Sequence, residues 1–205
     1  MSDDVFGSLV FPDEVEQAII ETCRTWFPEY LAYAERKLGF KPQEIPPIRK
    51  WIATADLTRW PEEQPPAVLV MNTGLAEEPS RTGRRDYSVK WAVGLAVVAS
   101  AKDAPTTDRL AKIYTGILRA ILTHKPDLGG FAEAIEWVDE GYDALPGGKR
   151  RRNLAAGQVI MRVEVKDAVT AFSGPQEPRE NPYEGPPPDD PTVAAADVTV
   201  SPLDD

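Results

Sequence analysis

The sequence predicts an α+β fold, in which a mainly antiparallel sheet carries two helices packed on one of its faces. The first observation is that residues 87–100 alternate between bulky apolar side chains on one face and mostly small ones on the other, which is the period of a strand. The second is that residues 107–123 repeat apolar side chains every three or four positions, which is the period of a helix with one buried stripe. A strand and a helix that each carry an apolar face bury them against one another, which is typical of a two-layer α+β domain.

A leading helix is expected before these two elements. It should begin near Asp13, whose spacing to Glu16 fits a capping box, and end at Gly39. Apolar side chains recur on one face of it: Val15, Ala18, Ile19, Cys23 and Trp26. Pro28 has no backbone N–H, so we expect the helix to kink or break there.

The remaining elements follow from apolar runs and turn signals. Strands are predicted at residues 51–57, 67–71, 133–138 and 154–165. A long polar loop, residues 74–86, precedes the 87–100 strand, and the main helix should end with His124 and Lys125 in its last turn, since Pro126 follows. Apart from the short first strand, the expected order is helix, strand, strand, helix, strand, strand.

The chain divides at Phe172 into a predicted α+β domain, residues 1–172, and a tail, residues 173–205. The tail contains eight prolines and eight acidic side chains against one basic residue, Arg179, with only scattered apolar groups. Such a segment cannot bury enough surface to offset the entropy of ordering it. We expect a disordered or extended tail, or an arm that orders only against a partner.

Composition excludes several classes of protein. The formal net charge of −10 makes the chain a poor candidate for wrapping duplex DNA, because phosphate binding needs clustered Lys and Arg. No stretch reaches the roughly 18 apolar residues of a membrane span, and residues 1–10 lack the pattern of a signal peptide. We therefore expect no membrane partner and synthesis in the cytoplasm.

No catalytic, cofactor-binding or metal-binding residue is predicted. The single cysteine, Cys23, and the single histidine, His124, leave no set of residues for a zinc or multi-histidine site. Cys23 is expected to be a buried structural thiol, and His124 to interact with the end of its helix. Gly147, Gly148 and Lys149 match only part of a phosphate-binding loop, because Arg150 occupies the place of the required Ser or Thr. We expect that the protein is not an enzyme, with an unrecognised enzyme kept as an alternative.

Two basic sets are candidate docking loops: Arg81, Arg84 and Arg85 in the 74–86 loop, and Lys149, Arg150, Arg151 and Arg152 in a turn before the last strand. Their functional interpretation is docking to an acidic protein surface. Solvated loops and nucleic-acid binding are the alternatives, although no aromatic residue interleaves with the arginines as single-strand binding would require.

The order of these elements resembles that of the tail terminator proteins of long-tailed bacteriophages. The resemblance runs from about Val15 to Lys166 and covers the leading helix, the 67–71 strand, the arginine-containing loop, the 87–100 strand, the main helix and the final pair of strands. It is a resemblance of pattern, because no short motif is diagnostic of the family. The tail and residues 41–66 exceed the family pattern.

The resemblance implies a virion protein of the tail and neck, made in the host cytoplasm. Six copies would form a ring at the head-proximal end of the tail tube, contacting the major tail tube protein and the head–tail connector while DNA passes through an acidic lumen without specific binding. A ring requires a heterologous interface that closes, and an exposed edge of the 87–100 strand is expected to supply it. A connector adaptor that binds the portal side is the alternative.

Overall fold

The structure, a computed structural model, describes residues 8–54, 65–83, 86–145 and 153–170, and it has the expected α+β fold. A six-stranded sheet has the strand order β1-β2-β4-β6-β5, with the short β3 paired to the start of β4. β1 runs parallel to β2 and the other pairs are antiparallel. In chain order the elements are α1 (Pro12–Leu38), β1 (Lys50–Ala53), β2 (Ala67–Leu75), β3 (Ser80–Arg81), β4 (Tyr87–Ala101), α2 (Ala104–His124), β5 (Ala134–Leu145) and β6 (Asn153–Val169).

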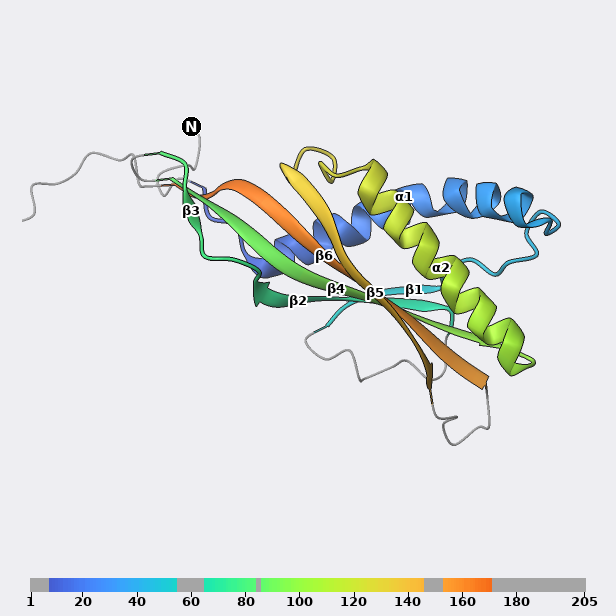
Figure 1. Cartoon of the computed structure of the whole chain (residues 1–205). Helices are drawn as coiled ribbons and strands as arrows, with labels where there is room; N and C mark the ends of the chain where they lie inside the picture. Colours follow the sequence, from blue (N-terminus) through green and yellow to red (C-terminus); the bar gives the residue numbers. More distant parts are fainter. Residues whose placement is uncertain (1–7, 55–64, 84–85, 146–152, 171–205) are drawn as a thin grey trace, which may run out of the picture. The chain divides into compact units, whose positions relative to one another are not determined.

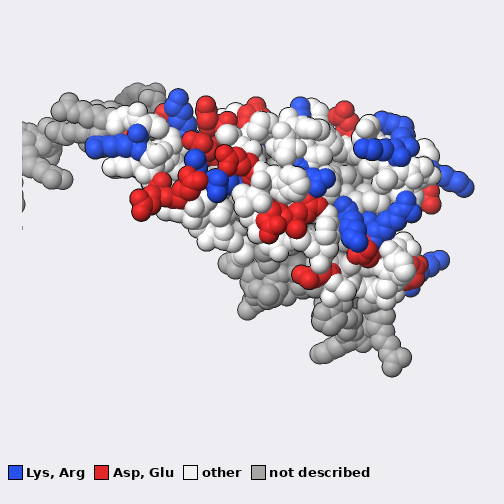
Figure 2. Space-filling view, in the orientation of Figure 1, with Lys and Arg blue, Asp and Glu red and all other residues white. Residues whose placement is uncertain are grey.

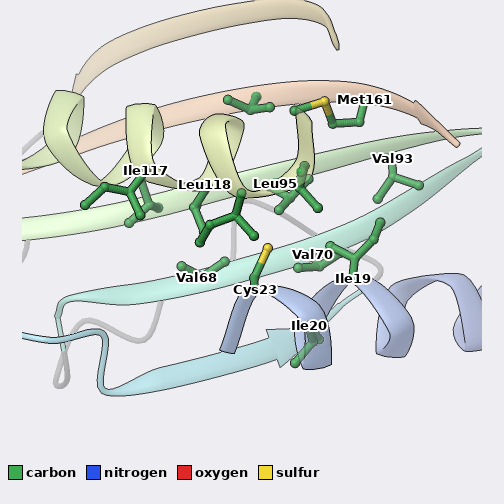
Figure 3. Close-up of a cluster of buried hydrophobic side chains, with 14 of the residues drawn as sticks. Ile19, Ile20, Cys23, Val68, Val70, Val93, Leu95, Ile117, Leu118 and Met161 are labelled. Carbon is green, nitrogen blue, oxygen red and sulfur yellow. The ribbon is translucent and has the colours of Figure 1, made fainter. Parts of the chain in front are cut away.

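One hydrophobic core lies between the helices and one face of the sheet. Figure 1 shows α1 and α2 beside the sheet, and Figure 3 shows Ile19 of α1 and Leu118 of α2 in the same cluster of buried side chains. From Val89 on, the alternate residues of β4 predicted to be bulky and apolar pack in it, as do Val68 and Val70 of β2 and Met161 of β6, whereas Tyr87 at the start of β4 is exposed. Cys23 of α1 is fully buried there, which confirms its predicted structural role.

β4 is a central strand of the sheet, so the expectation that its edge is exposed is wrong. It is hydrogen-bonded to β2 on one side and to β6 on the other. The physical reason is that both faces of β4 are apolar: Val93 and Leu95 are buried toward the helices, and Ala96 and Val98 are buried on the opposite face. A strand that is buried on both faces belongs inside a sheet.

α1 continues through Pro28 without a break over its 27 residues. The apolar stripe resumes beyond the proline at Leu31, so packing on the core outweighs the one lost hydrogen bond. The predicted cap is also shifted: Phe11 precedes the helix, and its backbone N–H donates to the Glu14 carboxylate at 2.6 Å. Gly39 ends the helix as expected, with φ at 75°.

β5 is longer than predicted, since it extends through residues that were expected to form a loop. Its pairing with β6 runs from Ala134 to Leu145, with a register shift between Trp137 and Asp139. The predicted tail, residues 173–205, lies outside the described residues, so the domain boundary stays a prediction. Among the described helices none is long and apolar enough to span a bilayer.

Candidate interaction surfaces

Arg81 lies in a row of exposed side chains that runs across four neighbouring segments. Arg81 of β3 is opposite Tyr87 of β4, Tyr87 is opposite Val169 of β6, and Val169 is opposite Leu9. Directly opposite residues of antiparallel strands share a face. We call Leu9, Arg81, Tyr87 and Val169 the distal row. Its apolar side chains are exposed: Leu9 by 54%, Tyr87 by 38% and Val169 by 39%.

Backbone hydrogen bonds join the N-terminal segment to the end of β6 beneath the distal row. Val10 donates its N–H to the carbonyl of Ala168 at 2.8 Å, and Thr170 donates to the carbonyl of Ser8 at 3.0 Å. The guanidinium carbon of Arg81 lies 5.9 Å from the centroid of the Tyr87 ring. The row is therefore a formed surface that combines apolar area with a cation.

Arg81 is the one predicted docking residue within the described residues. Arg84 and Arg85 lie outside them, as do Lys149, Arg150, Arg151 and Arg152 of the second basic set. The role of those six residues stays a prediction. The apolar partners of Arg81 in the distal row were not predicted, because Leu9 and Val169 are far apart in sequence.

The second surface is the outer edge of β5. This 12-residue strand ends the sheet and pairs with β6 alone among the described strands. Trp137, Val138 and Tyr142 of β5 are exposed by 50%, 52% and 41%. Such an edge offers backbone N–H and C=O groups for pairing with a strand of another chain. We call this strand with its outer side the β5 edge.

Cations of neighbouring elements hold the β5 carboxylates in place. Arg119 of α2 forms an ion pair with Glu140 at 2.6 Å and lies 4.6 Å from the centroid of the Trp137 ring. The Tyr142 hydroxyl donates to Glu140, and burial together with that bonded carboxylate raises the pKa of Tyr142 to about 12. Figure 2 shows carboxylates beside Lys and Arg on this face. The aromatic side chains of the β5 edge are thus fixed at the surface.

The third surface is a cleft of about 250 Å³ between α1 and the segment that leads into β1. The lining residues are Arg24, Phe27, Pro28, Pro47, Ile48, Arg49 and Trp51, and we call this site the arginine cleft. The rings of Phe27 and Trp51 meet edge to face with centroids 5.7 Å apart. Neither Arg24 nor Arg49 has an ion-pair partner among the described residues. The cleft therefore presents two cations without an ion-pair partner in the described part of the chain, above a floor formed by the rings of Phe27 and Trp51.

Sequence analysis missed the arginine cleft because its two walls, residues 24–28 and 47–51, come from separate parts of the chain. One local signal was available. Pro28 inside α1 removes the N–H that would normally bind the carbonyl of Arg24, so that carbonyl lacks its usual partner within the helix. The half-buried Trp51 was a second signal, because it follows two cationic residues.

Several other polar groups have hydrogen-bond partners within the fold. The buried Glu35 carboxylate accepts the backbone N–H groups of Gln43 and Ile45 at 3.0 and 2.9 Å, which fixes the loop after α1. Burial raises the pKa of the Cys23 thiol, which disfavours the reactive thiolate. His124 is in the last turn of α2 as predicted, with Nδ1 3.0 Å from the Tyr30 hydroxyl, whereas Lys125 lies one residue beyond the helix as its C-cap. No group of three or more metal-ligating side chains occurs in the described part of the chain.

No protein-family model matches the chain, and no curated protein sequence matches it either.

Proposed function

We propose that this chain is a structural subunit of a phage virion, a tail terminator whose copies form a ring at the head-proximal end of the tail tube. The observation that carries the proposal is the β5 edge. It is a long strand that ends the sheet and bears exposed Trp137, Val138 and Tyr142. These groups suit pairing between copies, since an unpaired edge with apolar side chains gains both backbone hydrogen bonds and burial on association.

The element order supports the assignment to this class of protein. The resemblance rests on a leading helix, a strand, an arginine-containing loop, a long strand, a helix and a strand pair. Apart from the short β1 between α1 and β2, the observed order α1, β2, β3 with Arg81, β4, α2, β5 and β6 agrees with it. A ring needs a heterologous contact, in which the β5 edge of one copy meets a different surface of the next.

The distal row supplies a separate surface for the tube or the connector. Its exposed apolar side chains and the Arg81 guanidinium suit a partner surface that is apolar with acidic groups at its margin. The acidic net charge of −10 is compatible with a lumen through which DNA passes without binding.

The test is assembly of the major tail tube protein of the same phage in the presence and absence of this chain. We expect short tubes of uniform length, with added density at one end by electron microscopy. The tube protein alone is the control and should give long tubes of variable length. An unchanged length distribution together with bare tube ends would contradict the proposal. Labelling of this chain at the portal side in intact particles would instead favour the connector adaptor.

A further inference from the structure

We propose that the arginine cleft of one copy binds the proline-rich acidic arm of a second copy, at residues 186–191. The inference deepens the proposed function, since it rests on the association of several copies. It assigns the cleft a ligand of defined chemistry, which is a run of prolines followed by two carboxylates. The chain itself carries such a segment, Pro186-Pro187-Pro188-Asp189-Asp190-Pro191.

The floor of the arginine cleft suits prolines. Trp51 is half-buried and presents part of its ring, while Pro28 and Pro47 are exposed at the margin. Three successive prolines favour the polyproline II conformation, because each fixes its own φ near −65°. Aromatic-lined grooves bind such segments at a low entropic cost, since little chain freedom is left to lose.

The margin of the cleft suits the two carboxylates that follow. Arg24 and Arg49 reach it from different elements, and neither forms an ion pair with a described residue. A guanidinium binds a carboxylate through two parallel hydrogen bonds, which is stronger and more directional than a lysine contact. Asp189 and Asp190 are adjacent in the chain, so the two guanidiniums of one cleft can each take one of them.

Chain length permits the arm to reach a second copy. The 15 residues between Thr170 and Pro186 span at most about 50 Å when extended. By comparison α1, with 27 residues, is about 40 Å long. The arm can therefore extend onto a neighbouring subunit of a ring, and arms exchanged in this way add a second contact to each interface. Two linked contacts strengthen association well beyond either one alone.

The experiment compares three full-length variants by sedimentation and by binding of a labelled peptide of residues 181–192. The cleft variant carries Arg24→Glu and Arg49→Glu, and the arm variant carries Asp189→Lys and Asp190→Lys. The matched control carries Arg36→Glu and Lys37→Glu, which make the same charge change in the last turn of α1, outside the cleft. Circular dichroism first establishes that each variant is folded.

We expect the cleft variant to bind the peptide more than tenfold more weakly than the control does, because the loss of one charge-assisted contact corresponds to about tenfold and the variant removes two. Each of the cleft and arm variants alone should associate more weakly than the control. A mixture of the two should recover part of the association, since the intact arm of one variant meets the intact cleft of the other.

Two results would overturn the inference. Equal peptide affinity of the cleft variant and the control would remove the cleft as the site. If the peptide binds but the mixture of cleft and arm variants does not regain association, an arm occupies the cleft of its own chain and not that of a second copy. Neither result depends on tube length. If the peptide binds and the mixed variants regain association but the tubes are not capped, the terminator role alone is contradicted.

Discussion

At the scale of single residues, Gly157 of β6 has the least room for a side chain among the described glycines. A Cβ built there collides with the Thr115 hydroxyl of α2 and also approaches the carbonyl oxygen of Ala111 at 3.3 Å. The absence of a side chain therefore lets α2 pack closely on the sheet. The contact between Gly157 and Thr115 thus brings β6 and α2 close together in the core.

We predict that Gly157→Ala lowers the free energy of unfolding by about 1–3 kcal/mol, because α2 must move or Thr115 must change rotamer. Denaturant titration measures the change. Gly141→Ala in β5 is the control, since nothing lies within 4 Å of its added Cβ. Equal stability of the two variants would show that the helix moves aside without cost.

Asp103 caps α2, and its carboxylate accepts the backbone N–H of Thr106 at 2.8 Å and the Thr106 hydroxyl at 2.9 Å. These hydrogen bonds, the backbone one first, hold the pKa of Asp103 below its ordinary value. A carboxyl whose folded pKa is lowered stabilises the fold above its unfolded pKa, and this stabilisation is lost as the pH falls through the folded pKa.

We therefore predict that Asp103→Ala lowers the melting temperature by a few degrees at neutral pH. The difference from the unchanged protein should shrink in acid, below the ordinary pKa of an aspartate. Thermal unfolding followed by circular dichroism over a pH series measures it. Asp108→Ala, which removes an exposed ion pair with Lys112 in the same helix, is the control and should have a smaller effect. A pH-independent difference would contradict the capping role.

Sequence patterns predicted those residues whose role is local. Cys23 belongs to an apolar stripe, so its burial followed from helical spacing. Glu16 shows the limit: its spacing to Asp13 indicated a cap, whereas its carboxylate accepts the backbone N–H of Asn72 in β2 at 2.6 Å. Burial raises the pKa of Glu16 against the opposing effect of this hydrogen bond. A partner 56 residues away leaves no trace in local spacing.

At the scale of elements, sequence periodicity predicted whether a long segment is a helix or a strand, but it did not predict which strands pair in the sheet. The alternation of residues 87–100 correctly predicted a strand, yet the position of β4 inside the sheet depends on its pairing with β2 and β6. β5 was predicted too short because Asp139, Gly141 and Asp143 are common in loops. Pairing with β6 outweighs those preferences.

The β5 edge leads to a prediction about assembly. Val138 lies at the register shift of β5 and is already 52% exposed, so Val138→Lys should leave the melting temperature nearly unchanged. A lysine on a sheet edge opposes pairing with another strand, and we expect weaker self-association by sedimentation. Tyr33→Lys, at a side chain of α1 that is 55% exposed, is the matched control. Unchanged association of the Val138 variant would move the interface away from β5.

At the scale of the whole molecule, stability and association should depend on different parts of the chain. The core cluster of the described residues runs from Val15 to Ala168 and joins both helices to one face of the sheet. The tail beyond Phe172 carries eight acidic side chains against one basic residue, so its removal changes the formal net charge from −10 to −3. A segment with this excess of negative charge has little apolar surface to bury in a core.

We predict that truncation after Phe172 changes the melting temperature little and weakens self-association strongly, because it removes the arm and keeps the core cluster. Differential scanning calorimetry and sedimentation on the same samples separate the two effects. A mixture of the truncated chain and the arm variant should not regain association, because neither carries an intact arm. A mixture of the truncated chain and the cleft variant should regain part of it, because the cleft variant keeps its arm. A fall of many degrees on truncation would instead mean that the tail covers the second apolar face of the sheet, where Leu69 and Val98 are buried.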